Sequence, residues 1–303
     1  MCSSDLVAER TENFEDLKNL VKEYTPEHVE SISGIPAETI RQIARLYATT
    51  EKAMIVYAMG ITQHITGVDN VKSLANLAML TGHLGIASAG VNPLRGQNNV
   101  QGACDMGGLP NVYSGYQRVN DEAARKKMEA KWGVQGLPEK PGITIMDMMK
   151  KIEQGSLQAL YVMGENPIVS DPDIKHVKEA LEHVPFLVVQ DMFLTETAQY
   201  AHVVFPACSF AEKDGTVSNT ERRVQLMRKA IEPLGSSKPD WAILQDLANR
   251  CGYPMNYSSP KEIMEEIAEV TPSYGGIQYD RLENGWGLRS EERRVGKECR
   301  SRW

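Results

Sequence analysis

The sequence predicts an α/β fold with doubly wound, mostly parallel, Rossmann-like sheets. Two observations support it: short β-rich apolar runs end in glycine or in polar residues, and segments with helical apolar spacing lie between them. Residues 53–60 (AMIVYAMG) form one such run, and residues 67–81 follow with Val71, Leu74 and Leu77 at helical spacing. A strand, a glycine turn and a helix in this order make half of a βαβ unit.

Helices are also predicted ahead of this unit. Residues 14–24 and 38–48 both place apolar side chains at helical spacing. Between them, Thr25 is followed directly by Pro26. A hydroxyl before a proline is typical of a helix start, because the hydroxyl accepts from a free backbone N–H and proline fixes the first helical φ. We therefore expect Thr25 to cap a short helical turn.

The same alternation returns in the second half of the chain. Residues 157–163, 185–189 and 203–206 predict three further buried strands, and residues 174–183 and 195–201 predict helical crossovers between them. Ligands of doubly wound sheets bind outside the carboxyl ends of the strands, so polar groups at those ends are candidate site residues. These candidates are Gly60, the segment 164–170, Gln190, Asp191 and the segment 207–209.

Residues 90–108 (GVNPLRGQNNVQGACDMGG) are rich in glycine and in side-chain amides. Glycine lets a backbone approach a ligand closely, and amides both donate and accept hydrogen bonds. Arg95 adds a planar cation that matches a carboxylate or a phosphate. The helical run before this stretch ends at Thr81 and the next amphipathic segment begins near Asn120, so we expect a long ligand-binding loop. A plain surface turn is the alternative.

Three other segments each allow a structural and a functional interpretation. Residues 164–171 (GENPIVSD) are either a turn broken at Asn-Pro or a set of amides facing a phosphate. Residues 212–225 predict a solvated hairpin that turns at Asp214-Gly215. Asp240 opens a helix, where it either caps the helix or accepts from the N1–H and N2–H2 edge of a guanine. Neither a G-x-G-x-x-G fingerprint nor a P-loop occurs in the sequence.

The two ends of the chain differ from the rest. Residues 1–6 (MCSSDL) and 289–303 (RSEERRVGKECRSRW) resemble translated sequencing-library adapters, and we expect both to be foreign to the protein. The alternative is a basic C-terminal tail that binds nucleic acid or a membrane. Residues 7–288 are then expected to be an internal piece of a longer protein.

Charge and cysteine content exclude several classes of function. The formal net charge is −7, and −9 without the two ends, which argues against binding nucleic acid through its phosphates. The cysteines outside the ends are Cys104, Cys208 and Cys251, and they form no CxxC or Cys/His cluster. We therefore expect no metal site within this piece, no disulfide framework and a reducing, cytoplasmic location. No apolar run reaches the ~20 residues of a membrane helix, so direct membrane insertion is not expected.

Four runs together carry a resemblance to a known family. They are residues 90–119 (GVNPLRGQNNVQGACDMGGLPNVYSGYQRV), 164–173 (GENPIVSDPD), 188–225 (VVQDMFLTETAQYAHVVFPACSFAEKDGTVSNTERRVQ) and 238–244 (KPDWAIL). The chain resembles the catalytic (alpha) subunits of molybdenum- or tungsten-dependent formate dehydrogenases. These enzymes belong to the bis-molybdopterin guanine dinucleotide (bis-MGD) oxidoreductases. The resemblance covers residues 7–279 in order and spacing, with a small departure at Ala207-Cys208.

The resemblance implies a fold, a reaction and partners. Residues 7–97 would end one α/β pterin-binding domain, and residues 98–288 would form a second, in the formate dehydrogenase/DMSO reductase fold. The full-length protein would oxidise formate to carbon dioxide at a bis-MGD centre with Mo or W. Electrons would leave through a [4Fe-4S] cluster to electron-transfer subunits, namely an iron–sulfur protein, a flavoprotein or a hydrogenase.

The resemblance also assigns roles to single residues. Arg95 would orient formate through its guanidinium, buried beside the metal, and Gln97 would line the same pocket. The residues implied to hold a pterin guanine dinucleotide are Gly164, Asn166, Ser170, Gln190, Asp191, Asn219 and Asp240, and Arg222 and Arg223 match the wider superfamily pattern near the cofactor.

Some family features have no counterpart in the chain. The metal-ligating Cys or selenocysteine, its neighbouring His and the cluster motif are expected upstream of Val7, and a C-terminal cap domain is expected beyond Leu288. The chain alone is therefore expected to be inactive. Two alternatives stay open: another bis-MGD oxidoreductase such as a nitrate reductase, or a non-catalytic, pterin-free relative like the one in respiratory complex I.

Overall fold

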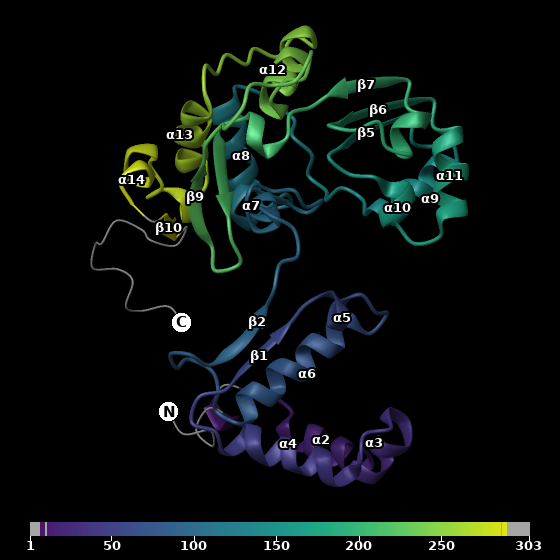
Figure 1. Cartoon of the computed structure of the whole chain (residues 1–303), viewed down its shortest axis with the longest axis vertical. Coiled ribbons are helices and arrows are strands. Elements are labelled where there is room, and N and C mark those ends of the chain that lie inside the picture. The colour runs from purple at the N-terminus through teal and green to yellow at the C-terminus, as the bar shows by residue number, and fades with distance from the viewer. Residues whose placement is uncertain (1–6, 10, 286, 290–303) are drawn as a thin grey trace. The chain divides into compact units, whose positions relative to one another are not determined.

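The computed structural model describes residues 7–9, 11–285 and 287–289, and Figure 1 shows the elements they form. Residues 1–6 and 290–303 lie outside the described residues, so the expectation of adapter-like ends is not addressed there. The chain divides into two compact units, Met1–Gly96 and Gln97–Trp303. Each unit is described by itself.

The first unit contains a parallel pair of strands and several helices. Strand β1 (Met54–Tyr57) pairs with β2 (Gly90–Pro93), with Met54 opposite Gly90. Helix α6 (Gly67–Leu80) lies between them in sequence, so the predicted strand and helix are confirmed. The other elements are α2 (Phe14–Leu20), η1 (Val21–Glu23), α3 (Pro26–Ser33), α4 (Ala37–Thr49) and α5 (Met59–Thr62).

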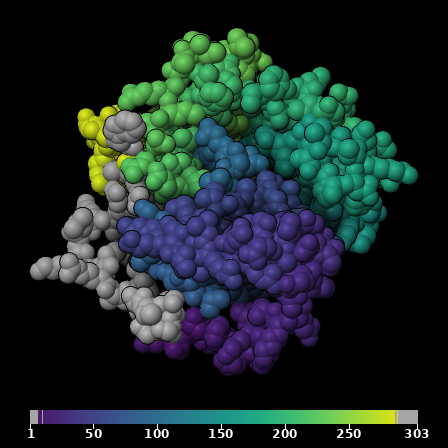
Figure 2. Space-filling view, turned by 60° about the horizontal axis from the view of Figure 1, so that its bottom comes forward, coloured from purple at the N-terminus to yellow at the C-terminus, as the bar shows by residue number. Residues whose placement is uncertain are grey.

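Local chemistry explains the start of α3. The Thr25 hydroxyl accepts from the backbone N–H of His28, and Pro26 occupies the first helical position, as predicted. Few side chains of the first unit are buried in the described chain, whose surface is shown in Figure 2. The buried residues of this unit are Ala37, Gly67, Ala78, His83 and Gly90.

The second unit is built around a parallel sheet in the order β5-β6-β7. Its strands are β5 (Ala159–Met163), β6 (Phe186–Asp191) and β7 (Val203–Pro206), and the helices around them are α9 (Ile145–Glu153), α10 (Pro167–Ser170), α11 (Ile174–His183) and η3 (Thr197–Tyr200). The three predicted strands and the helix over 174–183 are confirmed. Leu187 and Val189 of β6 pack in one core with Met149 of α9 and Leu181 of α11.

An antiparallel hairpin forms another part of the second unit (Figure 1). Strand β8 (Gly215–Ser218) pairs with β9 (Arg223–Met227), and β10 (Leu288–Arg289) adds to the outer side of β9. The predicted hairpin exists, but a turn at Asp214-Gly215 is wrong because Gly215 already begins β8. The chain turns at residues 219–222, where the Asn219 Oδ1 accepts from the Arg223 N–H at 2.9 Å.

The second unit contains ten further elements among its described residues. They are α7 (Val100–Asp105), β3 (Val112–Tyr113), η2 (Ser114–Tyr116), β4 (Gln117–Arg118), α8 (Glu122–Trp132), η4 (Phe210–Glu212), α12 (Asp240–Arg250), α13 (Pro260–Val270), η5 (Pro272–Tyr274) and α14 (Tyr279–Glu283). Val224 of β9 forms a second core with Met264 of α13, Tyr274 and Ile277.

The expectation of one long loop over residues 90–108 is wrong. The stretch begins with β2, which pairs with β1, and it contains α7. Asn99 precedes α7 in the left-handed region, with φ of 66°, and its Oδ1 accepts from the Ser218 N–H of β8 at 2.9 Å. Asn99 is one of the amide side chains that the sequence suggested for ligand binding, and in the structure it joins α7 to the hairpin.

A buried polar chain continues from this contact. The Ser218 hydroxyl is 2.8 Å from the Tyr274 hydroxyl, which donates to Asp105 Oδ2 at 2.9 Å. The other oxygen of Asp105 accepts from the Gln101 amide at 2.8 Å. All four side chains are buried. A buried polar group that loses its partner lowers the stability of the fold. This series of hydrogen bonds therefore fixes α7 against β8 and η5.

No helix among the described residues combines the length and the apolarity that a bilayer-spanning helix needs.

The contact between α7 and β8 generates the first prediction. A Cβ at Gly102 would lie 2.1 Å from Asn99 Oδ1, so Gly102→Ala should push the amide off the Ser218 N–H. We expect the free energy of unfolding to fall by about 1–3 kcal/mol, measured by urea denaturation. Gly60→Ala is the control, because a Cβ there meets nothing within 4 Å. Equal stability of the two variants would contradict the argument.

Candidate functional site

A cavity of about 590 Å³ lies in the second unit, at the carboxyl ends of the parallel strands. Gly164 follows β5 directly, Met192 follows β6 directly, and Cys208 lies two residues after β7; all three line it. Other parts of the wall come from residues 98–99, from β8, from the start of α12 and from α13. This is the edge at which ligands of parallel α/β sheets bind.

Asp240 lies at this edge because the segment before α12 runs beside the end of β7. The Lys238 N–H donates to the Pro206 carbonyl at 3.2 Å, and the Cys208 N–H donates to the Lys238 carbonyl at 3.0 Å. Asp240 is the first residue of α12, after the N-cap residue Pro239, and its carboxylate oxygens bond to the side chains of Gln190 and Lys213. The capping interpretation is therefore wrong, and Asp240 forms part of the cavity wall.

A buried amide positions the Asp240 carboxylate. Gln190 of β6 is 0% exposed, and its Nε2 donates to Asp240 Oδ1 at 2.8 Å. The Tyr161 hydroxyl of β5 donates to Gln190 Oε1 at 2.5 Å. The orientation of the amide is thus set from both sides, because only its NH2 group can donate to a carboxylate. We name Tyr161, Gln190, Asp240 and Lys213 the strand-end network.

Lys213 completes the strand-end network. Its ammonium pairs with Asp240 Oδ2, and both side chains are partly exposed, at 22% for Lys213 and 30% for Asp240. Lys213 follows η4, which is held by Glu212: this carboxylate accepts from the Ser209 and Leu234 N–H groups, each at 2.8 Å. Burial, and then the charge of Asp240, raise the pKa of Tyr161, so its hydroxyl stays a donor at neutral pH.

Gly164 needs its glycine for backbone reasons. Its φ is 64°, and a Cβ would meet nothing within 4 Å, so the constraint is the left-handed conformation rather than space. Its N–H donates to the Gln190 carbonyl at 2.9 Å, which ties the end of β5 to β6. Of the predicted cofactor residues, Gly164 and Asp240 line the cavity, and Gln190 lies directly behind Asp240.

Three other predicted residues bond to protein groups near the strand ends. Asn166 Oδ1 accepts from the Thr197 hydroxyl at 2.7 Å, and its amide donates to Glu196 at 2.7 Å. Ser170 is exposed, and its hydroxyl is 3.3 Å from Asp171 Oδ1. Asp191 Oδ1 accepts from the Phe193 N–H at 3.0 Å. None of the three is among the residues that line the 590 Å³ cavity in the described chain.

Three further predicted residues lie on the hairpin turn or at the start of β9. Asn219 bonds within the turn, and Arg223 Nη1 donates to the Gly287 carbonyl at 3.2 Å. The Arg222 guanidinium lies 5.8 Å from the centre of the Tyr116 ring, a cation–π distance. Their cofactor roles stay predictions.

Arg95 and Gln97 lie on either side of the division between the two units. Both side chains are exposed in this chain, whereas the sequence analysis expects a buried guanidinium at Arg95. The physical reason is their position: they follow β2 on a connecting segment and belong to no helix or strand. Their catalytic roles stay predictions.

Sequence reasoning missed several residues of the cavity wall. Lys213 and Trp241 line it together with Phe210 and Met192. Lys213 lies within a run that marks the resemblance, but its spacing gives no sign that it would meet Asp240 27 residues later. Trp241 is next to Asp240 in sequence, so a search around that residue could have found it.

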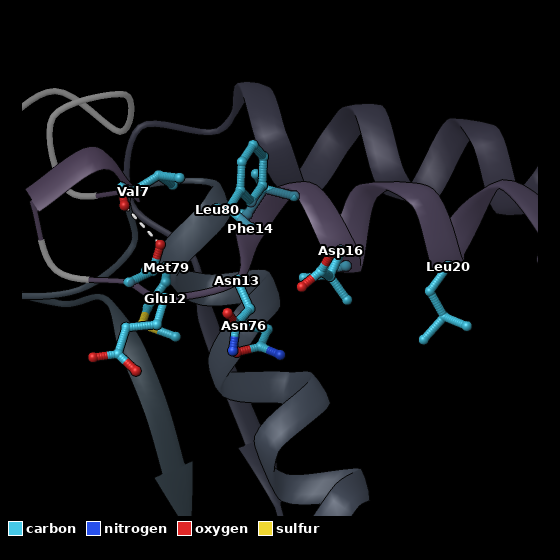
Figure 3. Close-up of a pocket in the computed structure, with 11 residues that line it drawn as sticks. Val7, Glu12, Asn13, Phe14, Asp16, Leu20, Asn76, Met79 and Leu80 are labelled. Atoms are coloured by element: carbon cyan, nitrogen blue, oxygen red, sulfur yellow. Dashed lines mark hydrogen bonds between the residues drawn. The ribbon is translucent and has the colours of Figure 1, made fainter.

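A second cavity, of about 310 Å³, belongs to the first unit (Figure 3). Its wall comes from α2, the residues before it and the end of α6, with Phe14, Leu20, Met79 and Leu80 among the apolar side chains. It contains none of the predicted site residues. Among the described residues, no group of three or more His, Cys, Asp or Glu could hold a metal ion.

Comparisons with known proteins agree with this architecture. A family model described as molybdopterin oxidoreductase matches residues 4–250. The F420-dependent formate dehydrogenase subunit alpha of Methanocaldococcus jannaschii is 52% identical over 284 residues, covering 93% of this chain and 42% of that protein. Formate dehydrogenase H of Escherichia coli is 46% identical over 276 residues, covering 91% and 39%.

A solved structure extends the comparison to the fold. Acetylene hydratase from Pelobacter acetylenicus matches with a TM-score of 0.69 at 18% identity, over 94% of this chain and 42% of that one. This likeness concerns the fold alone, and it confirms the predicted α/β class with parallel sheets. The chain spans about two fifths of the length of the relatives it matches.

The strand-end network generates the second prediction. Gln190→Leu would leave the half-buried Tyr161 hydroxyl and Asp240 Oδ1 without this partner, so we expect a loss of about 1–3 kcal/mol in the free energy of unfolding. Lys213→Met removes only a partly exposed ion pair and should cost less than about 1 kcal/mol. Urea denaturation measures both. A larger effect of Lys213→Met would show that the ion pair, rather than the amide, anchors Asp240.

Proposed function

This chain belongs to the molybdopterin oxidoreductase family, and from that premise we propose that it is a piece of the catalytic subunit of a formate dehydrogenase. The observation that carries the proposal is the identity of 46% and 52% to two formate dehydrogenase subunits over nine-tenths of the chain. The run around Arg95 (NPLRGQNN) supports formate as the substrate, because a guanidinium matches a small carboxylate.

We infer that a molybdopterin guanine dinucleotide binds in the 590 Å³ cavity. The volume lies in the range of small-molecule sites, and the wall offers the Asn98 and Asn99 side chains and the Thr216 hydroxyl as hydrogen-bonding groups. Carboxylate oxygens accept hydrogen bonds, so Asp240 suits the two N–H donors of a guanine edge. Gly164 gives the ligand close access to the backbone. The donor set thus fits a purine nucleotide.

We assign different roles to the residues predicted to bind the cofactor. Gly164 and Asp240 touch it in this proposal, and Gln190 positions Asp240. Asn166 and Asp191 hold the loops after β5 and β6 through the hydrogen bonds described above. For Ser170 and Asn219 we retain the cofactor contact that the family resemblance implies, without a geometric argument.

Formate oxidation breaks the C–H bond of formate and releases carbon dioxide, one proton and two electrons. A molybdenum or tungsten centre on the bound pterin supplies the two-electron acceptor. Arg95 would hold both carboxylate oxygens of formate, and Gln97 would line the same pocket, so that the C–H bond is presented in one orientation. The electrons would pass through a [4Fe-4S] cluster to iron–sulfur, flavoprotein or hydrogenase subunits.

An assay of the full-length subunit tests the function. We expect formate-dependent reduction of an artificial electron acceptor, no turnover of nitrate, and Mo or W with pterin in the purified protein. Nitrate reduction without formate oxidation would identify another oxidoreductase of the family. A protein with neither metal nor pterin would identify a non-catalytic relative.

The third prediction concerns Arg95. In the full-length subunit, Arg95→Lys replaces a planar two-pronged donor by a single ammonium, so we expect the KM for formate to rise by at least about tenfold. Steady-state kinetics with formate measures it. Arg118→Lys, an exposed arginine on β4, is the matched control and should leave the KM unchanged. An unaltered KM in Arg95→Lys would remove Arg95 from the substrate site.

A further inference from the structure

Lys213 brings a hydrogen-bond donor to the cavity, beside the acceptor that Asp240 provides. Both residues line the 590 Å³ cavity and both side chains are partly exposed, so a ligand can reach them. An ammonium group carries three N–H donors. Asp240 is the one hydrogen-bond partner that the described residues give this ammonium, so further N–H groups are left for a ligand.

The Asp240 carboxylate also has acceptor sites left. Its two oxygens offer about four lone-pair sites. Gln190 uses one site on Oδ1, and Lys213 uses one on Oδ2. Each oxygen therefore keeps a site for a ligand. The groups that a ligand meets follow one another in the order ammonium, Oδ2, Oδ1, which is the order donor, acceptor, acceptor.

Among the common nucleobases, this order is complementary to guanine alone. Guanine presents the O6 acceptor, the N1–H donor and the N2–H2 donor along one edge. Adenine and cytosine would set the lone pair of a ring nitrogen against Oδ2, and uracil would set a carbonyl oxygen against Oδ1. Such pairs of facing acceptors repel each other, which is how a site rejects the wrong partner. Hypoxanthine avoids the repulsion but lacks the third group.

We propose that Lys213 is a specificity-determining residue, which donates a hydrogen bond to the guanine O6 while Asp240 accepts from N1–H and N2–H2. This inference rests on the proposed function, because that function places a guanine nucleotide in the cavity. The ion pair of Lys213 and Asp240 has no net charge, which suits an uncharged base. Gln190 fixes the carboxylate, and two backbone N–H groups hold Glu212, the residue before Lys213.

Binding of guanosine 5′-monophosphate (GMP) and two analogues to the cofactor-free full-length subunit tests the proposal. In 6-thio-GMP a sulfur, which is a weaker acceptor, replaces O6, and inosine 5′-monophosphate (IMP) lacks the N2 amino group. We expect the wild type to bind GMP about three- to tenfold more tightly than either analogue, the effect of one hydrogen bond. Lys213→Met should bind GMP and 6-thio-GMP equally and should still prefer GMP to IMP. Isothermal titration calorimetry measures these affinities.

Lys131→Met is the matched control. Lys131 of α8 also pairs with a carboxylate of another helix, Glu269 of α13, and neither side chain is buried. Lys131 does not line the cavity. We expect Lys131→Met to bind the three nucleotides as the wild type does. Thermal unfolding of the two variants checks that each of them is folded.

The outcomes separate the inference from the function on which it rests. If Lys213→Met loses affinity equally for GMP and 6-thio-GMP, Lys213 acts only by positioning Asp240 and the inference is overturned. It is also overturned if the wild type binds no GMP or binds both nucleotides equally. Tighter binding of 6-hydroxymethylpterin, whose ring has the same order of carbonyl, N–H and amino groups, would overturn guanine as the ligand. In each case, formate oxidation by the wild-type subunit would leave the proposed function standing.

Discussion

The contact on which the candidate site depends is the hydrogen bond between the buried Gln190 amide and the Asp240 carboxylate. It joins the central strand of the parallel sheet to the first turn of α12. The amide is fully buried, so its two ends must both be satisfied, and Tyr161 and Asp240 do this from opposite sides. A change at Tyr161 or at Asp240 would leave one end of the buried Gln190 amide without its partner. Through Gln190, the sheet therefore fixes the position of the Asp240 carboxylate in the cavity wall.

The fold was predictable wherever the pattern that specifies an element is local. Residues 174–183 and 203–206 have the predicted bounds, because helical spacing and a continuous apolar run are visible within one segment. Strand β2 was not predictable in the same way. It is four residues long, contains asparagine and proline, and owes its existence to β1, whose last residue lies 33 positions before Gly90. Because the two paired strands are far apart in the sequence, the apolar pattern of residues 90–93 alone does not indicate their pairing.

The candidate site was also predictable only in part. The edge of the sheet at which it lies could be predicted, but the orientation of each side chain could not. The rule that ligands meet the carboxyl ends of parallel strands correctly predicted Gly164 as part of a cavity wall. It could not tell which way each polar side chain turns. Asn166 bonds to the Thr197 hydroxyl, and Asp191 bonds to the backbone N–H of Phe193. Lys213 reaches Asp240 only through the fold, so its contribution could not be predicted from spacing.

The charges of the cavity limit how it could hold the dinucleotide that we propose. Two carboxylates and one ammonium line the wall, and the ammonium is bound to one of the carboxylates. Attraction for phosphate cannot therefore dominate binding at this wall, unlike in sites built around arginine clusters. The affinity must come from neutral hydrogen bonds and from contact with apolar surface, which Trp241 and Phe210 provide. In such a site each hydroxyl or amide counts individually, because no strong charge interaction compensates for its loss.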